Sequence, residues 1–143
     1  MDENPYLHSR RALHLRFDIP ILKTKEFWDM LRQGKLVTTK CLKCGNVSFP
    51  PQADCPKCMG SESEWVDLGT DATLVTFTHV KITPASFAED GTYTIAIAQL
   101  KSGLKVLAWL EGVGAETVKP GMGLRIEARA GTGGSPYYVF VPA

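Results

Sequence analysis

The chain has 143 residues, of which 44% are apolar and 22% are charged, and its formal net charge is +1. This composition is typical of one packed globular domain, or of two small modules that share a core. No run in the sequence approaches the roughly 20 apolar residues of a membrane helix, so we expect no membrane partner.

The first 22 residues predict a short helix followed by an extended arm. Asn4 can cap a helix and Pro5 can occupy its first turn. From Leu13 to Ile19 apolar residues alternate with others, as in an extended segment, until Pro20 interrupts the pattern. An apolar arm before the main fold suggests contact with a partner chain, including self-association. Packing on its own domain is an equal alternative.

A clearer helix is predicted over residues 24–33. Thr24 can cap its start and Gly34 can end it. Apolar side chains recur at i, i+3 and i+4, which places them on one face that we expect to be buried. These side chains are Phe27, Met30 and Leu31, and Trp28 widens the face.

All four cysteines of the chain come next, after a short strand predicted over residues 36–39. They form two Cys-x-x-Cys pairs with ten residues between the pairs. Four thiolates at this spacing can enclose one ion, and soft ligands in a closed tetrahedral set suit Zn²⁺. We therefore predict a structural zinc site with no open position for a substrate. Its ligands are Cys41, Cys44, Cys55 and Cys58.

Two alternatives to zinc remain open at this point. Disulfides are disfavoured because the chain starts with an acidic, polar segment and no secretion signal, which predicts a cytoplasmic protein with reduced thiols. The two pairs also resemble the iron-binding turns of rubredoxin, which would make the protein an electron carrier. Visible absorption separates these metals, because a ferric tetrathiolate is red and a zinc site is colourless.

The segment between the two pairs cannot form a helix, because Pro50 and Pro51 lie within it. Two cysteine turns joined by short strands make a zinc ribbon, a module too small to bury a core of its own. We expect the metal to replace that missing core.

From Trp65 to the end of the chain, alternating apolar residues predict strands and turns and no convincing helix. Five strands favour a small closed barrel, of which the OB fold is the commonest five-stranded form. The run from Trp65 to Ile82 is interrupted by Gly69, which predicts a single bent first strand. The other strands are predicted over residues 93–100, 104–110, 124–129 and 137–141.

The connection from Thr83 to Gly91 is longer than a hairpin needs. A long loop at a barrel mouth often contributes to binding, and a plain surface loop is an equal alternative. The sequence shows no phosphate-binding or hydrolase motif, and His79 lies in a predicted strand, where a lone histidine is usually structural. We therefore predict that the chain is not an enzyme by itself.

Charge is unevenly distributed along the sequence. Residues 1–40 carry a net charge of +3, residues 41–69 carry −2, and residues 70–143 carry zero. A module that binds nucleic acid is usually basic, so the neutral barrel disfavours that function. Because aromatic residues of an OB barrel can stack on bases, a protein that binds single-stranded nucleic acid remains the alternative.

The order of these parts resembles one known family. A helix with Phe27 and Trp28 precedes Cys41-Leu42-Lys43-Cys44-Gly45, Phe49-Pro50-Pro51, Cys55-Pro56-Lys57-Cys58 and a barrel that opens at Trp65. This order is similar to the acyl-CoA-associated zinc-ribbon and OB-fold family, catalogued as domain of unknown function number thirty-five. The likeness runs from about residue 20 to the C-terminus. Gln52 stands where many members have arginine, and Met59 stands where glycine often follows the last cysteine.

The resemblance implies a mainly β fold with an N-terminal helical arm (residues 1–36), a rubredoxin-like zinc ribbon (37–64) and a C-terminal five-stranded OB-fold barrel (65–143). It also implies a non-catalytic accessory subunit of a thiolase-like enzyme that binds the CoA part of an acyl-CoA and holds structural zinc. CoA needs cations for its phosphates and an aromatic or apolar surface for the rest. Solvated surface lysines are the commoner alternative for each cation taken alone. The candidates for CoA contact are Lys40, Lys43, Lys57, Lys81 and Phe87.

Overall fold

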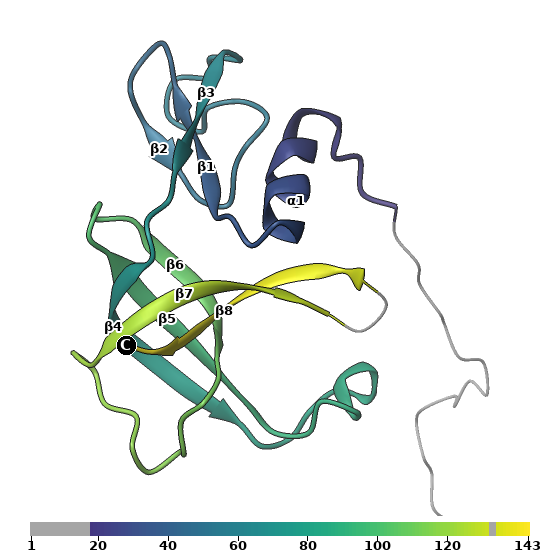
Figure 1. Ribbon diagram of the computed structural model, residues 1–143, viewed down its shortest axis with the longest axis vertical. Helices are drawn as coiled ribbons and strands as arrows, with labels where there is room; N and C mark the ends of the chain where they lie inside the picture. Colours follow the sequence, from purple (N-terminus) through teal and green to yellow (C-terminus); the bar gives the residue numbers. More distant parts are fainter. Residues whose placement is uncertain (1–17, 132–133) are drawn as a thin grey trace, which may run out of the picture.

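A computed structural model describes residues 18–131 and 134–143, so the predicted helix and arm up to residue 17 lie outside the described residues. The described fold has two parts, which lie one above the other in Figure 1: a three-stranded sheet with an α-helix beside it, and a five-stranded barrel. The elements are η1 (Leu22–Thr24), α1 (Lys25–Arg32), β1 (Val37–Cys41), β2 (Val47–Ser48), β3 (Ser63–Asp67), β4 (Asp71–Val80), η2 (Ala85–Phe87), β5 (Tyr93–Leu100), β6 (Lys105–Leu110), β7 (Gly123–Ala130) and β8 (Pro136–Pro142).

Helix α1 follows the prediction closely. Thr24 occupies the capping position, but its hydroxyl donates to the carbonyl of Ile21 at 3.4 Å instead of capping the helix. The predicted apolar face is confirmed, because Phe27 and Leu31 are each only 2% exposed. In the part of the chain that the structure describes, no helix is long and apolar enough to cross a membrane.

The three-stranded sheet has the order β2-β1-β3, with both neighbours of β1 antiparallel to it. This sheet corrects the prediction of one bent strand from Trp65 to Ile82. Trp65 lies on β3 and pairs with Thr39 of β1, whereas the barrel begins only at β4. Gly69 separates the two strands in a left-handed conformation (φ 77°), and its N–H donates to the Asp67 carboxylate at 2.7 Å. The division of the chain at residues 36 and 64 stays a prediction.

The barrel closes in the order β4-β5-β6-β8-β7, with β7 returning to β4. All its neighbouring strands are antiparallel except β6 and β8, which are parallel. The fold is therefore mainly β with a closed five-stranded OB-type barrel, as predicted. One detail differs: a register shift between Leu74 and Thr76 turns the second half of β4, so Phe77 is half-buried while Thr76 is exposed.

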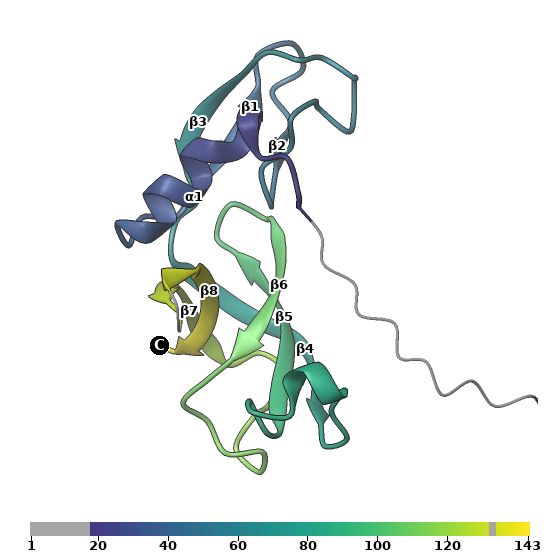
Figure 2. The ribbon, with the colours of Figure 1, turned by 90° about the vertical axis from the view of Figure 1, so that its right-hand side faces the viewer.

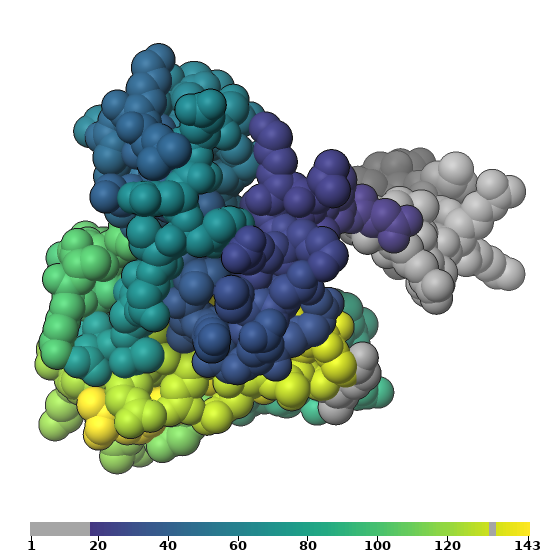
Figure 3. Space-filling view, turned by 45° about the horizontal axis from the view of Figure 1, so that its top comes forward, coloured from purple at the N-terminus to yellow at the C-terminus, as the bar shows by residue number. Residues whose placement is uncertain are grey.

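Aromatic side chains join the two parts of the molecule. Phe27 of α1, Phe49 from the segment after β2, and Tyr138 of β8 contact one another edge to face. The ring centroids of Phe49 and Tyr138 are 5.1 Å apart, and those of Phe27 and Phe49 are 5.9 Å apart. Figures 2 and 3 show α1 resting against the barrel on the side of β7 and β8. The helix thus packs between the small sheet and the barrel and contacts both.

Candidate metal centre and neighbouring surfaces

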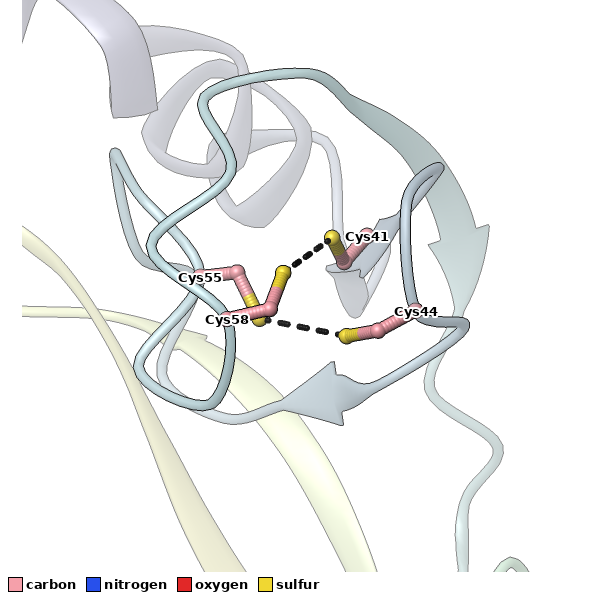
Figure 4. A group of neighbouring side chains, drawn as sticks. All are labelled: Cys41, Cys44, Cys55 and Cys58. Atoms are coloured by element: carbon pink, nitrogen blue, oxygen red, sulfur yellow. Dashed lines mark hydrogen bonds between the residues drawn. The ribbon is translucent and has the colours of Figure 1, made fainter.

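The four cysteine sulfurs lie together at one end of the small sheet (Figure 4). Every pair of sulfurs is within 4.8 Å. The closest contacts join one turn to the other: Cys41 Sγ to Cys58 Sγ and Cys44 Sγ to Cys55 Sγ, both at 3.6 Å. The two Cys-x-x-Cys turns therefore face each other, and each supplies two sulfurs to a common centre.

The donor set and spacing fit a zinc ion. A zinc–sulfur distance of about 2.3 Å in a tetrahedron gives sulfur–sulfur separations of about 3.8 Å. The observed contacts of 3.6 Å are close to this value, and they are far longer than the roughly 2 Å of a disulfide bond. The residues present thus suit a four-thiolate metal site and leave no ligand position open.

Backbone N–H groups in each turn point at the first sulfur of that turn. As thiols, Cys41 has a lowered pKa because the N–H of Cys44 stabilises its thiolate, and the N–H of Cys58 lowers the pKa of Cys55 to about 6. At Cys58 the N–H of Gly60 favours the thiolate. The hydrogen bond with Cys44 and desolvation outweigh that effect and raise the pKa of Cys58 to about 12. A dication at the centre would replace the protons that such a cluster shares.

The two turns differ at the residue after the second cysteine. Gly45 in the first turn and Met59 in the second occupy the same place, since each donates its N–H to the carbonyl of the first cysteine of its turn at 2.9 Å. Both are left-handed, with φ of 71° for Gly45 and 59° for Met59. This conformation costs glycine little, but it disfavours a residue with a side chain. Met59 is also 76% exposed.

The residues predicted to contact CoA fall into two separate groups. Lys40, Lys43 and Lys57 are exposed on the small sheet and its turns, and Lys40 pairs with Glu64 at 3.2 Å. Lys81 and Phe87 belong to the loop region after β4, at the opposite end of the molecule in Figures 1 and 2. The structure therefore does not gather all five into one site.

Phe87 belongs to an aromatic cluster that the sequence did not reveal. Tyr93 and Trp109 stack nearly parallel, with ring centroids 4.5 Å apart and planes 13° apart. Phe87 lies tilted beside them, 5.8 Å from Tyr93 and 6.1 Å from Trp109. These residues come from η2, β5 and β6, so their proximity depends on strand pairing that no local sequence pattern encodes.

His79 is hydrogen-bonded, as expected for a structural histidine in a strand. Its Nδ1 lies 2.7 Å from the Thr94 hydroxyl across the β4–β5 pair, and its Nε2 lies 3.2 Å from the carbonyl oxygen of Ala115. Since a carbonyl oxygen only accepts, the pair of contacts places the imidazole proton on Nε2. His79 thus ties two strands to the loop that precedes β7.

Two family models match adjoining parts of the chain. The model described as "ChsH2, rubredoxin-like zinc ribbon domain" matches residues 28–65, and "ChsH2, C-terminal OB-fold domain" matches residues 65–129. Together they cover most of the chain. The first match also supports the assignment of the four clustered cysteines as a zinc-binding site.

Curated relatives share a quarter to a third of the aligned residues. A "DUF35 domain-containing scaffold protein" of Methanocaldococcus jannaschii is 31% identical over 94 residues, which is 65% of each chain. One of Pyrococcus furiosus is 29% identical over 109 residues, 76% of this chain and 79% of that protein. The "Benzoylsuccinyl-CoA thiolase subunit BbsA" of Thauera aromatica is 34% identical over 73 residues, 51% of this chain and 49% of that protein. The chain thus spans about two thirds of the first relative and half of the last.

Two solved structures share the fold. The structure titled "Ltp2-ChsH2(DUF35) aldolase" superposes with a TM-score of 0.75 and 20% identity, over 89% of this chain and 98% of that chain. A DUF35-family protein of unknown function from Sulfolobus solfataricus superposes with a TM-score of 0.53 and 23% identity, over 71% and 75% of the two chains. At these identities the likeness concerns the fold alone.

Proposed function

Since the chain belongs to the DUF35 family of zinc-ribbon and OB-fold proteins, we propose that it is a non-catalytic accessory subunit that scaffolds a thiolase-type enzyme complex acting on acyl-CoA. The observation that carries this proposal is the unbroken match of ribbon and barrel models over residues 28–129. Two relatives are named scaffold proteins, and a third is named a thiolase subunit.

The metal centre supports a structural role for zinc within this proposal. Cys41, Cys44, Cys55 and Cys58 would hold the ion, and a closed set of four thiolates stabilises a fold without presenting the metal to a substrate. The chain's own contribution is to keep two turns facing each other at the end of the small sheet. An iron-loaded protein would absorb visible light, so a colourless protein that contains one equivalent of zinc is the expected result.

Binding of acyl-CoA by this chain is the second part of the proposal. The candidate cations Lys40, Lys43 and Lys57 on the ribbon and Lys81 on the barrel could each meet a phosphate, and Phe87 adds an apolar surface. Because these residues form two groups, a single CoA molecule would use one of them in the isolated subunit. Substituting Lys81 and the ribbon lysines separately, each by alanine, would show which group contributes.

The test of the accessory role is reconstitution with a thiolase from the organism that encodes this chain. We expect the full chain, loaded with zinc, to co-elute with that thiolase in size-exclusion chromatography, and to bind acyl-CoA by calorimetry. A protein that does neither would contradict the proposal. Salt-dependent binding to single-stranded oligonucleotides at low micromolar concentration would instead favour the nucleic-acid alternative.

A further inference from the structure

A wide groove lies where helix α1, strand β6 and the β7–β8 hairpin meet. Its volume is about 820 Å³, which falls within the range of about 300–1,000 Å³ that is usual for small-molecule sites. Four aromatic side chains line it. They are Trp28 of α1, Trp109 of β6, and Tyr137 and Tyr138 of β8.

Three of these four rings are held in place by other aromatic residues. Trp28 contacts Phe27 edge to face at 5.1 Å, Tyr138 contacts Phe49 in the same way at 5.1 Å, and Trp109 stacks on Tyr93. Side chains that are already fixed lose little conformational freedom when a ligand binds. The groove is therefore preorganised to receive a flat apolar group.

Part of the groove's apolar surface is exposed to water. Leu107 is 59% exposed and Tyr137 is 38% exposed, and both line the groove. A ligand that covered them would gain from burial of apolar surface. A planar ring would in addition gain from stacking or edge contacts with the aromatic lining.

The charges in the groove disfavour phosphate. Its described lining includes the carboxylates of Asp90 and Glu111 and no basic side chain. A second groove of about 540 Å³ shares Asp90, Trp109 and Glu111 with the first and adds Lys81. Among the described residues that line the two grooves, Lys81 is the one lysine or arginine. A long ligand with an anionic end would therefore place that end near Lys81 and its uncharged end in the first groove.

We propose that the groove lined by Trp28, Trp109, Tyr137 and Tyr138 binds the acyl group of an acyl-CoA, and that it selects acyl groups that carry a ring over short aliphatic ones. This inference rests on the proposed acyl-CoA function and names its substrate class. The selection comes from the aromatic walls, and Lys81 of the neighbouring groove would attract the phosphates.

The test compares three probes by calorimetry on the zinc-loaded full chain: benzoyl-CoA, acetyl-CoA and free CoA. We expect benzoyl-CoA to bind about tenfold more tightly than acetyl-CoA, which is the effect of one or two good aromatic contacts. Leu107→Ala and Tyr137→Ala change exposed side chains, so folding should be retained, and each should reduce the preference for benzoyl-CoA severalfold. Leu42→Ala is the matched control, because Leu42 is also 59% exposed but lies on the ribbon.

Equal affinities for benzoyl-CoA and acetyl-CoA would overturn the inference and leave the acyl-CoA function standing. Free CoA that binds as tightly as benzoyl-CoA would also overturn it, since the adenine ring and not the acyl group would then supply the contact. If both Leu107→Ala and Tyr137→Ala kept the full preference for benzoyl-CoA over acetyl-CoA, the ring would bind outside this groove, and the inference would be overturned. Failure to bind any of the three probes overturns the inference together with the acyl-CoA part of the proposed function, whereas the accessory role is judged separately by co-elution with the thiolase.

Discussion

The ribbon and the barrel are stabilised in different ways. Within residues 37–64, the buried side chains are only those of Thr38, Thr39, Cys41, Pro51 and Cys55, and none of them is a large apolar one. The barrel instead encloses a continuous apolar core, which includes Leu74, Ile126 and Phe140, each at most 1% exposed. From this difference we expect the short segment, which has no core of its own, to depend on a metal, whereas the five paired strands depend on apolar burial.

Loss of the metal should have the largest effect on stability, and the effect should be confined to the ribbon. We expect Cys41→Ser, or removal of zinc by a chelator, to unfold the ribbon and leave the barrel folded. Zinc binding contributes on the order of 10 kcal/mol to folding in isolated zinc-finger peptides, and a ribbon without a core has little to replace it. Zinc analysis with circular dichroism measures the effect. Leu42→Ala, beside the same turn, is the control, and a Cys41→Ser protein that keeps a full equivalent of zinc would contradict the prediction.

A cavity in the barrel core should destabilise the barrel and leave zinc binding by the ribbon intact. Phe140 is fully buried, so Phe140→Ala should lower the free energy of unfolding by about 3–5 kcal/mol. Urea unfolding followed by tryptophan fluorescence measures this loss. Val75→Ala on the exposed face of β4 is the control. If Phe140→Ala also abolished zinc binding in the absence of urea, the two regions would not be independently stabilised.

The contacts among Phe27, Phe49 and Tyr138 form an aromatic joint between the ribbon and the barrel. We expect this joint to determine how far the two parts unfold together. Phe49→Ala removes the edge contacts to Phe27 and Tyr138, and we expect a loss of about 2 kcal/mol with a separation of the ribbon and barrel transitions. Hydrogen exchange resolved by residue reports both parts at once. Unchanged coupling in the variant would show that the backbone connection, and not the joint, transmits the effect.

The smallest expected effects lie in the two cysteine turns, and they have opposite signs. Met59→Gly should stabilise the ribbon by about 1 kcal/mol, since glycine tolerates the left-handed conformation that Met59 adopts. Gly45→Ala should destabilise it by a similar amount at the equivalent place in the other turn. Competition with a chromophoric zinc chelator measures both. A Met59→Gly variant that binds zinc less tightly than the wild type would contradict this reading of the backbone.

Local patterns predicted the elements that depend on neighbouring residues. Helix α1 was recognisable because Phe27 and Leu31 lie one helical turn apart, and the metal cluster because each turn brings its own two cysteines together. The β3 strand was assigned wrongly to the barrel. Trp65 alternates like a barrel residue, but its pairing partner, Thr39, is 26 positions earlier in the chain.

The sequence by itself therefore determined the helix, the cluster of four cysteines and the number of barrel strands, because periodicity and spacing act over a few residues. Only the tertiary structure decided which strand joins which sheet, and it alone brought Trp28, Trp109 and Tyr137 to one groove and separated Lys81 from the ribbon lysines. These contacts join residues far apart in the chain. Their formation depends on closing the barrel and packing α1 against it, which no local pattern encodes.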